Sequence, residues 1–215
     1  MALLLGLVLI AMATPRLVAG LLVAPFDGEL REMALGRPVE GQVLLAATLA
    51  YEDALAWHDE ANAAGELAGF NYVLAQGLGF GGEAGRAYLE RSLAAARRAV
   101  AGNPALPYAW LQMSVALETL EGPSPRSVGA LVESMRRAPY QPRLAVLRAG
   151  LALRTWTLLD AEARALAGLQ VLLAARVDAA ALAGVVPSPS LWRVVQDILL
   201  AEPELLLAVQ AARGD

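Results

Sequence analysis

Apolar residues recur along most of this chain with the period of an α-helix. In the stretch LWRVVQDILL, residues 191–200, they fall at spacings of three and four, which places them on one face of a helix. No segment alternates apolar and polar residues between turn signals, as a half-buried strand would. The pattern therefore predicts an all-α protein.

Prolines, glycines and capping residues indicate where the helices begin and end. A turn at Gly36-Arg37-Pro38 precedes the first helix of the domain, and GLGFGG at 77–82 separates two later ones. GLGFGG comes after a helix and lacks a subsequent Lys-Ser/Thr, which favours an interhelical loop over a phosphate-binding loop. We expect helices at 39–57, 59–76, 83–100, 107–120, 125–137, 142–156 and 160–177, and two more after Ser190 and Pro203.

The N-terminal stretch is apolar enough to cross a membrane. Residues 2–24 hold a single charge, Arg16, and as a helix they measure about 35 Å against a hydrocarbon core of about 30 Å. Twelve Leu, Ile or Val residues, each worth about −0.4 kcal/mol, outweigh one arginine at about +3 kcal/mol. We predict a transmembrane anchor at 1–25, a linker at 26–38 and a helical domain at 39–215.

A cleaved signal peptide is the alternative for this stretch. Ala11-Met12-Ala13 resembles a cleavage motif, and cutting there would leave Thr14 as the N-terminus. The apolar run continues to Ala24 without a preceding basic region, which favours the anchor. Arg31 and Arg37 would place the domain in the cytoplasm by the positive-inside rule. An uncleaved N-terminal span usually directs the export of the domain behind it, so we expect a single-pass protein of a bacterial inner membrane with a periplasmic domain.

The amino-acid composition limits which kinds of partner and site the protein can have. Hydrophobic residues make up 57% of the chain and charged residues 18%, so part of the apolar surplus is expected to face lipid or a partner. The net charge of −4 gives no basic footprint for nucleic acid, and no nucleic-acid partner is predicted. The chain has no cysteine, which excludes disulfides and thiolate metal sites.

Candidate catalytic chemistry is sparse. His58, the only histidine, lies beside Asp59 and Glu60 and comes after Glu52 and Asp53. These residues could form a general base or part of a metal site, but a helix junction with acidic residues at the next helix start is favoured. No catalytic residue, metal ligand or cofactor is assigned.

Arginines and tryptophans have structural and functional interpretations. The pairs Arg97/Arg98 and Arg136/Arg137 recur near the ends of two predicted helices, where cations stabilise the helix dipole. Contact with an anionic glycan or a lipid headgroup is the alternative. The four tryptophans are interpreted as helix packing rather than as sugar platforms: Trp57, Trp110, Trp156 and Trp192.

One segment returns in altered form 35 residues later. NPALPYAW at 103–110 and APYQPRLA at 138–145 both carry a P-x-x-P step. Small residues precede each step at matching distances, Ser92 and Ala99 before the first and Ser127 and Ser134 before the second. This pattern resembles the tetratricopeptide repeat (TPR), a helical hairpin of about 34 residues that ends in proline.

The resemblance covers about residues 83–155. Trp110, Met113 and Ser114 stand at typical TPR positions, whereas their equivalents Ala145, Arg148 and Ala149 match less well. It implies a TPR-like solenoid of α-hairpins with degenerate flanking helices, in which each hairpin stacks on its neighbour. With the N-terminal span, the pattern resembles bacterial membrane-anchored TPR-like proteins associated with envelope polysaccharide synthesis.

By this resemblance, the first helix of each hairpin lines a groove that binds a protein partner. We expect these groove positions, Leu153 included, to be partly exposed: Tyr108, Leu111, Val115, Glu118 and Thr119, then Arg143, Val146, Gly150, Leu153 and Arg154. The leading hypothesis is a membrane-tethered scaffold that binds a protein of an envelope assembly. The alternative is an accessory enzyme or glycan-binding factor of polysaccharide synthesis, which a deep pocket with converging carboxylates would favour.

Overall fold

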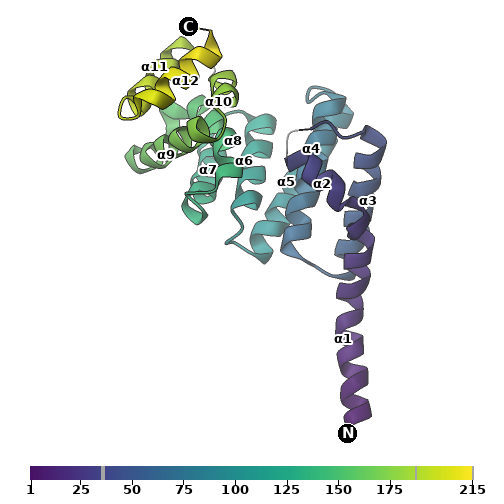
Figure 1. Ribbon diagram of the computed structural model, residues 1–215. Coiled ribbons are helices and arrows are strands. Elements are labelled where there is room, and N and C mark those ends of the chain that lie inside the picture. The colour runs from purple at the N-terminus through teal and green to yellow at the C-terminus, as the bar shows by residue number, and fades with distance from the viewer. Residues whose placement is uncertain (35–36, 187, 215) are drawn as a thin grey trace. The chain divides into compact units, whose positions relative to one another are not determined.

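The computed structural model describes residues 1–34, 37–186 and 188–214, and for residues 2, 3 and 31–34 it describes the backbone only. Within these ranges the chain forms helices and no strand, which confirms the all-α prediction (Figure 1). Two compact units divide the chain, residues 1–104 and residues 105–215. We call them unit 1 and unit 2. The boundary lies at Pro104, which begins the first P-x-x-P step.

Unit 1 begins with the long apolar helix α1, which continues through Pro15. Helices α3, α4 and α5 succeed one another as antiparallel neighbours, and α1 packs against α3. Residues 27–34 of the predicted linker are helical, in accord with the acidic Asp27 and Glu29 in the first turn. Gly36 of the predicted turn lies outside the described residues. The elements are α1 (Ala2–Val23), the 3-10 helix η1 (Ala24–Phe26), α2 (Asp27–Ala34), α3 (Gly41–Trp57), α4 (Ala61–Leu78) and α5 (Glu83–Gly102).

The core of unit 1 lies between α3, α4 and α5. Tyr51 of α3 and Phe70 of α4 are buried with their ring centroids 5.2 Å apart in an edge-on arrangement. Burial raises the pKa of the Tyr51 hydroxyl, which also forms a hydrogen bond with the half-buried Glu66. Burial likewise raises the pKa of Glu66. The aromatic pair and this polar contact fix α4 against α3.

The GLGFGG segment makes the tight turn between α4 and α5. Gly79 has a φ of +80°, which favours glycine, and its carbonyl accepts a hydrogen bond from the Gly82 amide at 3.2 Å. The start of α5 then passes so close to this turn that a Cβ atom on Gly85 would lie 2.0 Å from the Gly79 carbonyl oxygen. Glycine is therefore required at Gly79 and Gly85, and GLGFGG lies between two helices as the sequence predicted.

Unit 2 consists of two antiparallel helix pairs, α6 with α7 and α8 with α9, and then three short helices. Five of its helices have a proline in their first turn, where the missing N–H costs nothing. The elements are α6 (Pro107–Glu121), α7 (Pro125–Arg137), α8 (Pro142–Arg154), the 3-10 helix η2 (Trp156–Leu158), α9 (Ala161–Val177), α10 (Ala179–Val185), α11 (Pro189–Leu199) and α12 (Pro203–Arg213).

Side-chain caps place two of these helix starts where the sequence predicted them. Ser124 and Ser127 form a reciprocal capping box at the start of α7. At the start of α9, the Asp160 carboxylate accepts a hydrogen bond from the Ala163 amide at 2.8 Å. Both P-x-x-P steps also separate helices as expected, since α6 starts at Pro107 and α8 at Pro142. A TPR-like stacking of the hairpins stays a prediction.

Buried serines lie where paired helices meet. The Ser92 hydroxyl of α5 donates to the Ala68 carbonyl of α4 at 2.8 Å, and the Ser134 hydroxyl of α7 donates to the Pro107 carbonyl of α6 at 2.7 Å. Ser114 of α6 donates to the Ser127 carbonyl of α7 at 2.8 Å. Ala99 and Ser134, the small residues five positions before the two P-x-x-P steps, are both fully buried.

Arg148 of α8 is the largest fully buried side chain of the chain's described part. Its guanidinium donates to the Ser134 hydroxyl at 3.1 Å, the Ser134 carbonyl at 2.6 Å, the Ala138 carbonyl at 2.8 Å and the Gln170 amide oxygen at 3.3 Å. Burial lowers its pKa to about 10, so the group keeps its charge at neutral pH. Two of the acceptors are carbonyls at the end of α7, where the helix dipole favours a cation.

The C-terminal helices close the core of unit 2. Apolar residues of α8 and α9 pack with α10, α11 and α12 in one buried cluster. Trp192 of α11 belongs to it, with the Arg213 guanidinium 4.9 Å from its ring centroid. The seven-residue helix α10 was not predicted from the sequence, because AAALAGV has too few large apolar residues to show a helical period.

Candidate functional site

The predicted groove residues lie on α6 and α8 of unit 2, but they differ widely in exposure. Leu111, Val115 and Leu153 are buried, with Leu111 and Leu153 fully inaccessible. The remaining α6 residues, Tyr108, Glu118 and Thr119, are half-buried, as is Val146 of α8, while Arg143 and Arg154 are exposed. Part of this set therefore forms core rather than surface.

The expectation that Leu153 is partly exposed is wrong. Leu153 belongs to the buried cluster that α8 forms with α9, α10, α11 and α12. A fully buried side chain in this cluster cannot contact a partner unless the helices separate.

Two of the predicted residues are brought together by the fold. Arg154 of α8 donates from Nε to the Oε1 atom of Glu118 on α6 at 2.6 Å. The Glu118 side chain is 11% exposed and that of Arg154 is 42% exposed. Glu118 is the one carboxylate among the predicted groove residues, and it meets a guanidinium rather than a second carboxylate.

The middle of the predicted groove on α8 is occupied by the chain itself. A Cβ atom on Gly150 would lie 3.2 Å from Cβ of Val185 on α10 and 3.7 Å from Nη1 of Arg154. Gly150 is buried and lets α10 approach α8 closely. Sequence reasoning missed this because it did not detect α10.

The exposed part of α8 lies nearer its N-terminus. Tyr140, in the turn before the helix, is 73% exposed, and Leu147 is 43% exposed. Arg143 lies between them in sequence, on the exposed surface. No ion pair of Arg143 is found among the described residues, and half-buried Val146 adjoins it along the helix. We call Tyr140, Arg143, Val146 and Leu147 the α8 surface.

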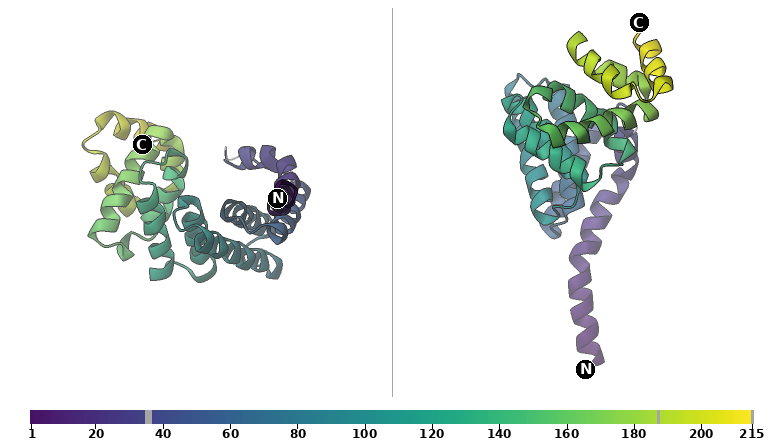
Figure 2. Two further views of the ribbon diagram at one scale, coloured as in Figure 1. Left: turned by 90° about the horizontal axis from the view of Figure 1, so that it is seen from below. Right: turned by 90° about the vertical axis from the view of Figure 1, so that its left-hand side faces the viewer.

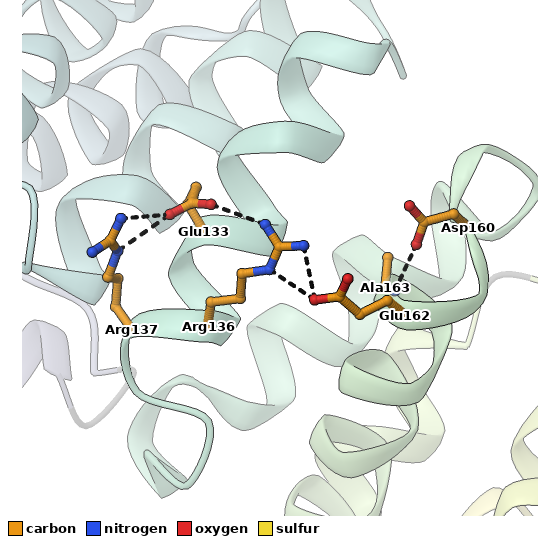
Figure 3. A network of polar contacts seen from close by, with 6 residues as sticks. All are labelled: Glu133, Arg136, Arg137, Asp160, Glu162 and Ala163. Carbon is orange, nitrogen blue, oxygen red and sulfur yellow. Dashed lines mark hydrogen bonds and ion pairs between the residues drawn. The ribbon is translucent and has the colours of Figure 1, made fainter.

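The arginines at the end of α7 are engaged in ion pairs within the chain (Figure 3). Glu133 accepts hydrogen bonds from Arg137 at 2.8 Å and from Arg136 at 3.2 Å, and Arg136 also donates to Glu162 of α9 at 2.8 Å. The hydrogen bond from Arg137, more than that from Arg136, lowers the pKa of Glu133. In unit 1, Arg98 donates to Asp59 at 2.8 Å and to the Leu55 carbonyl at 3.0 Å.

The acidic residues around His58 have structural roles. Asp59 pairs with Arg98, and the Glu60 carboxylate caps α4 by accepting from the amides of Asn62 at 3.1 Å and Ala63 at 2.8 Å. Within the described residues, no group of three or more His, Asp or Glu side chains is placed to hold a metal ion. These contacts support the interpretation of the segment as a helix junction.

No protein-family model, curated protein or solved structure matches this chain.

Proposed function

We propose that this protein is a membrane-tethered helical scaffold that binds a protein partner through the α8 surface of unit 2. The exposed α8 surface carries the proposal. It combines an aromatic side chain, an arginine without an ion pair among the described residues, and a leucine, and Tyr and Arg are among the residue types that contribute most to binding at protein interfaces. Arg143 favours a partner segment that presents a carboxylate beside apolar side chains.

Helix α1 supports the membrane tether. It is long and apolar enough to cross a bilayer by length and composition. Its large apolar side chains from Leu4 to Met12 are 53–70% exposed, a degree of exposure that water does not favour for so many neighbouring groups. The resemblance to bacterial membrane-anchored TPR-like proteins adds the proposal of a periplasmic domain that serves an envelope assembly, with polysaccharide synthesis or export as the process.

The tether predicts resistance to alkaline extraction. We expect the full-length protein to stay in the pellet when membranes of the expressing cells are washed with alkaline carbonate, because the aliphatic residues of α1 outweigh Arg16 in lipid. N-terminal sequencing of the pelleted protein checks that α1 is retained. Release into the supernatant with Thr14 at the N-terminus would instead show a cleaved signal peptide.

Reversing the charge of the α8 surface is expected to abolish partner capture. In a pull-down of the full chain from detergent-solubilised membranes, the Arg143→Glu variant should lose the bands that the parent retains, because the new carboxylate repels the partner's. Arg193→Glu is the matched control, since Arg193 is also exposed in unit 2 and has no ion pair among the described residues.

Equal capture by the parent, Arg143→Glu and Arg193→Glu would show that the α8 surface does not bind the partner. Far-UV circular dichroism of each variant verifies that the helices are intact, so that a loss of capture is not a loss of fold.

A further inference from the structure

The surroundings of α1 change at Pro15. Before it, the large apolar side chains are exposed around the helix, as Leu4 at 69%, Ile10 at 64% and Met12 at 70% illustrate. From Pro15 onward, a stripe at spacings of three and four is buried or half-buried where α1 packs on α3: Pro15, Val18, Ala19 and Leu22. The first half of α1 thus stands free of the other helices of unit 1, and the second half is packed among them (Figure 2).

The first charged side chain of the sequence lies at this transition. Arg16 is exposed and comes immediately after Pro15. An arginine at the centre of a bilayer costs about 2.5–3.5 kcal/mol, whereas at the boundary its guanidinium reaches the headgroups. The free stretch from Leu4 to Thr14, at about 1.5 Å per residue, is long enough to reach the middle of a hydrocarbon core of about 30 Å.

An exposed tryptophan lies on the side of unit 1 from which α1 projects. Helix α3 runs antiparallel to α1, and its C-terminal end points toward the projecting half of α1 (Figure 1). The last residue of α3 is Trp57, which is 55% exposed, so its interpretation as a packing residue is wrong. Tryptophan is enriched at the boundary between lipid and water, where its ring is half in each.

The α3–α4 corner, residues 57–60, is fixed by hydrogen bonds. These bonds also engage its two acidic side chains, Asp59 and Glu60. Arg98 of α5 bridges the Leu55 carbonyl and the Asp59 carboxylate across the end of α3. Glu60 is engaged by the amides at the start of α4. Glu52, one turn before the corner on α3, is exposed, and so is Asp53. Their charges keep the body of α3 out of hydrocarbon.

We propose that the boundary of the hydrocarbon core crosses α1 at Thr14–Arg16 and that the α3–α4 corner with Trp57 rests in the lipid headgroup layer. This inference rests on the proposed membrane tether and specifies its form: with this boundary, α1 enters the bilayer to about its middle and does not cross it. Leu17, which is exposed at 64%, then lies in the interfacial layer, about 5–7 Å thick on each side of the core, and Leu21, exposed at 66%, lies at the outer edge of this layer. The half of helix α1 before Pro15 is then the membrane anchor, and the half after Pro15 packs on α3 as part of unit 1.

Cysteine labelling locates the boundary, since the chain has no cysteine of its own. Gly6 and Gly20 form a matched pair on α1, because a Cβ atom on either would meet nothing within 4 Å. The full chain carrying Gly6→Cys or Gly20→Cys is reconstituted into phosphatidylcholine/phosphatidylglycerol vesicles and treated with a membrane-impermeant maleimide. Labelling of Leu78→Cys, at the opposite end of α4 from this corner, gives the fraction of domains that face outward.

We expect Gly20→Cys to react to the same extent as Leu78→Cys and Gly6→Cys to be protected. Protection of both glycine positions would place the boundary beyond Gly20 and overturn the inference while the tether stands. Reaction at both positions would mean that α1 does not enter the bilayer, and the proposed tether itself would fail.

A second measurement tests the corner. Trp57 and Leu78 have nearly the same exposure, 55% and 53%. Trp57 ends α3 and Leu78 ends α4, and because these helices are antiparallel the two residues lie at opposite ends of the pair. An environment-sensitive dye on Trp57→Cys should be quenched by a lipid with a spin-labelled headgroup, and the same dye on Leu78→Cys should not. Equal quenching at the two positions, or none at Trp57→Cys, would show that the corner does not rest on lipid.

Discussion

Replacing Arg148 by alanine is expected to destabilise unit 2 by about 3–5 kcal/mol. The substitution removes the largest fully buried side chain of the described residues and leaves the carbonyls of Ser134 and Ala138 without their donor. Against a total stability of about 5–15 kcal/mol, this loss is large enough to populate the unfolded state. Denaturant unfolding of the full chain in mild detergent measures it, and tryptophan fluorescence reports mainly on unit 2, which holds Trp110, Trp156 and Trp192.

Two further variants serve as controls for the Arg148→Ala measurement. Arg126→Ala removes an exposed ion pair with Glu121 and should cost no more than about 1 kcal/mol. Arg148→Lys keeps the charge but cannot reach all of the acceptors, so its loss should be intermediate. If Arg148→Ala unfolds at the same denaturant concentration as Arg126→Ala, the buried guanidinium contributes little to the stability of unit 2.

Gly85→Ala is expected to destabilise unit 1 by about 3 kcal/mol, through overpacking against backbone that cannot move aside. The new Cβ atom would lie 2.0 Å from the Gly79 carbonyl oxygen and 3.2 Å from the Ala75 carbonyl oxygen. To relieve the clash, α5 would have to move away from the end of α4. Denaturant unfolding of the full chain, monitored by far-UV circular dichroism, measures the loss.

Gly129→Ala provides a control of opposite sign. Gly129 lies inside α7, is exposed, and has nothing within 4 Å of the position its Cβ would take. Alanine there should stabilise the helix by about 0.5–1 kcal/mol. A Gly85→Ala variant that is as stable as the parent would show that the α4–α5 turn is looser than the structure indicates.

Helix starts were predictable from the sequence because they depend on neighbouring residues. Pro107, Pro125 and Pro142 each fix the backbone at a first helical turn, and the sequence shows them directly. Helix α10 and the helical part of residues 26–38 were not predicted. Short helices of small or polar residues owe their stability to packing rather than to an apolar period that a sequence displays.

The candidate site was predictable only in part, because burial depends on distant elements. Leu153 fits a groove position by its spacing on α8, yet it is buried in the cluster that α8 forms with the helices after it. The Arg148 acceptors come from α7 and α9, which no local pattern links to an arginine that only weakly matched the repeat. Glu118 and Arg154, by contrast, were assigned to one surface and form an ion pair.

The buried serines restrict how the helices can slide. Each hydroxyl of Ser92, Ser114 and Ser134 meets a single backbone carbonyl on the paired helix. A shift of one helix by a turn, about 5.4 Å, would leave that hydroxyl buried without its acceptor, at about 1–3 kcal/mol for each serine. The α4–α5 and α6–α7 pairs therefore have one favoured axial register. Slow motions of this protein should then occur as rotations at the turns that join one helix pair to the next, with each pair moving as one body.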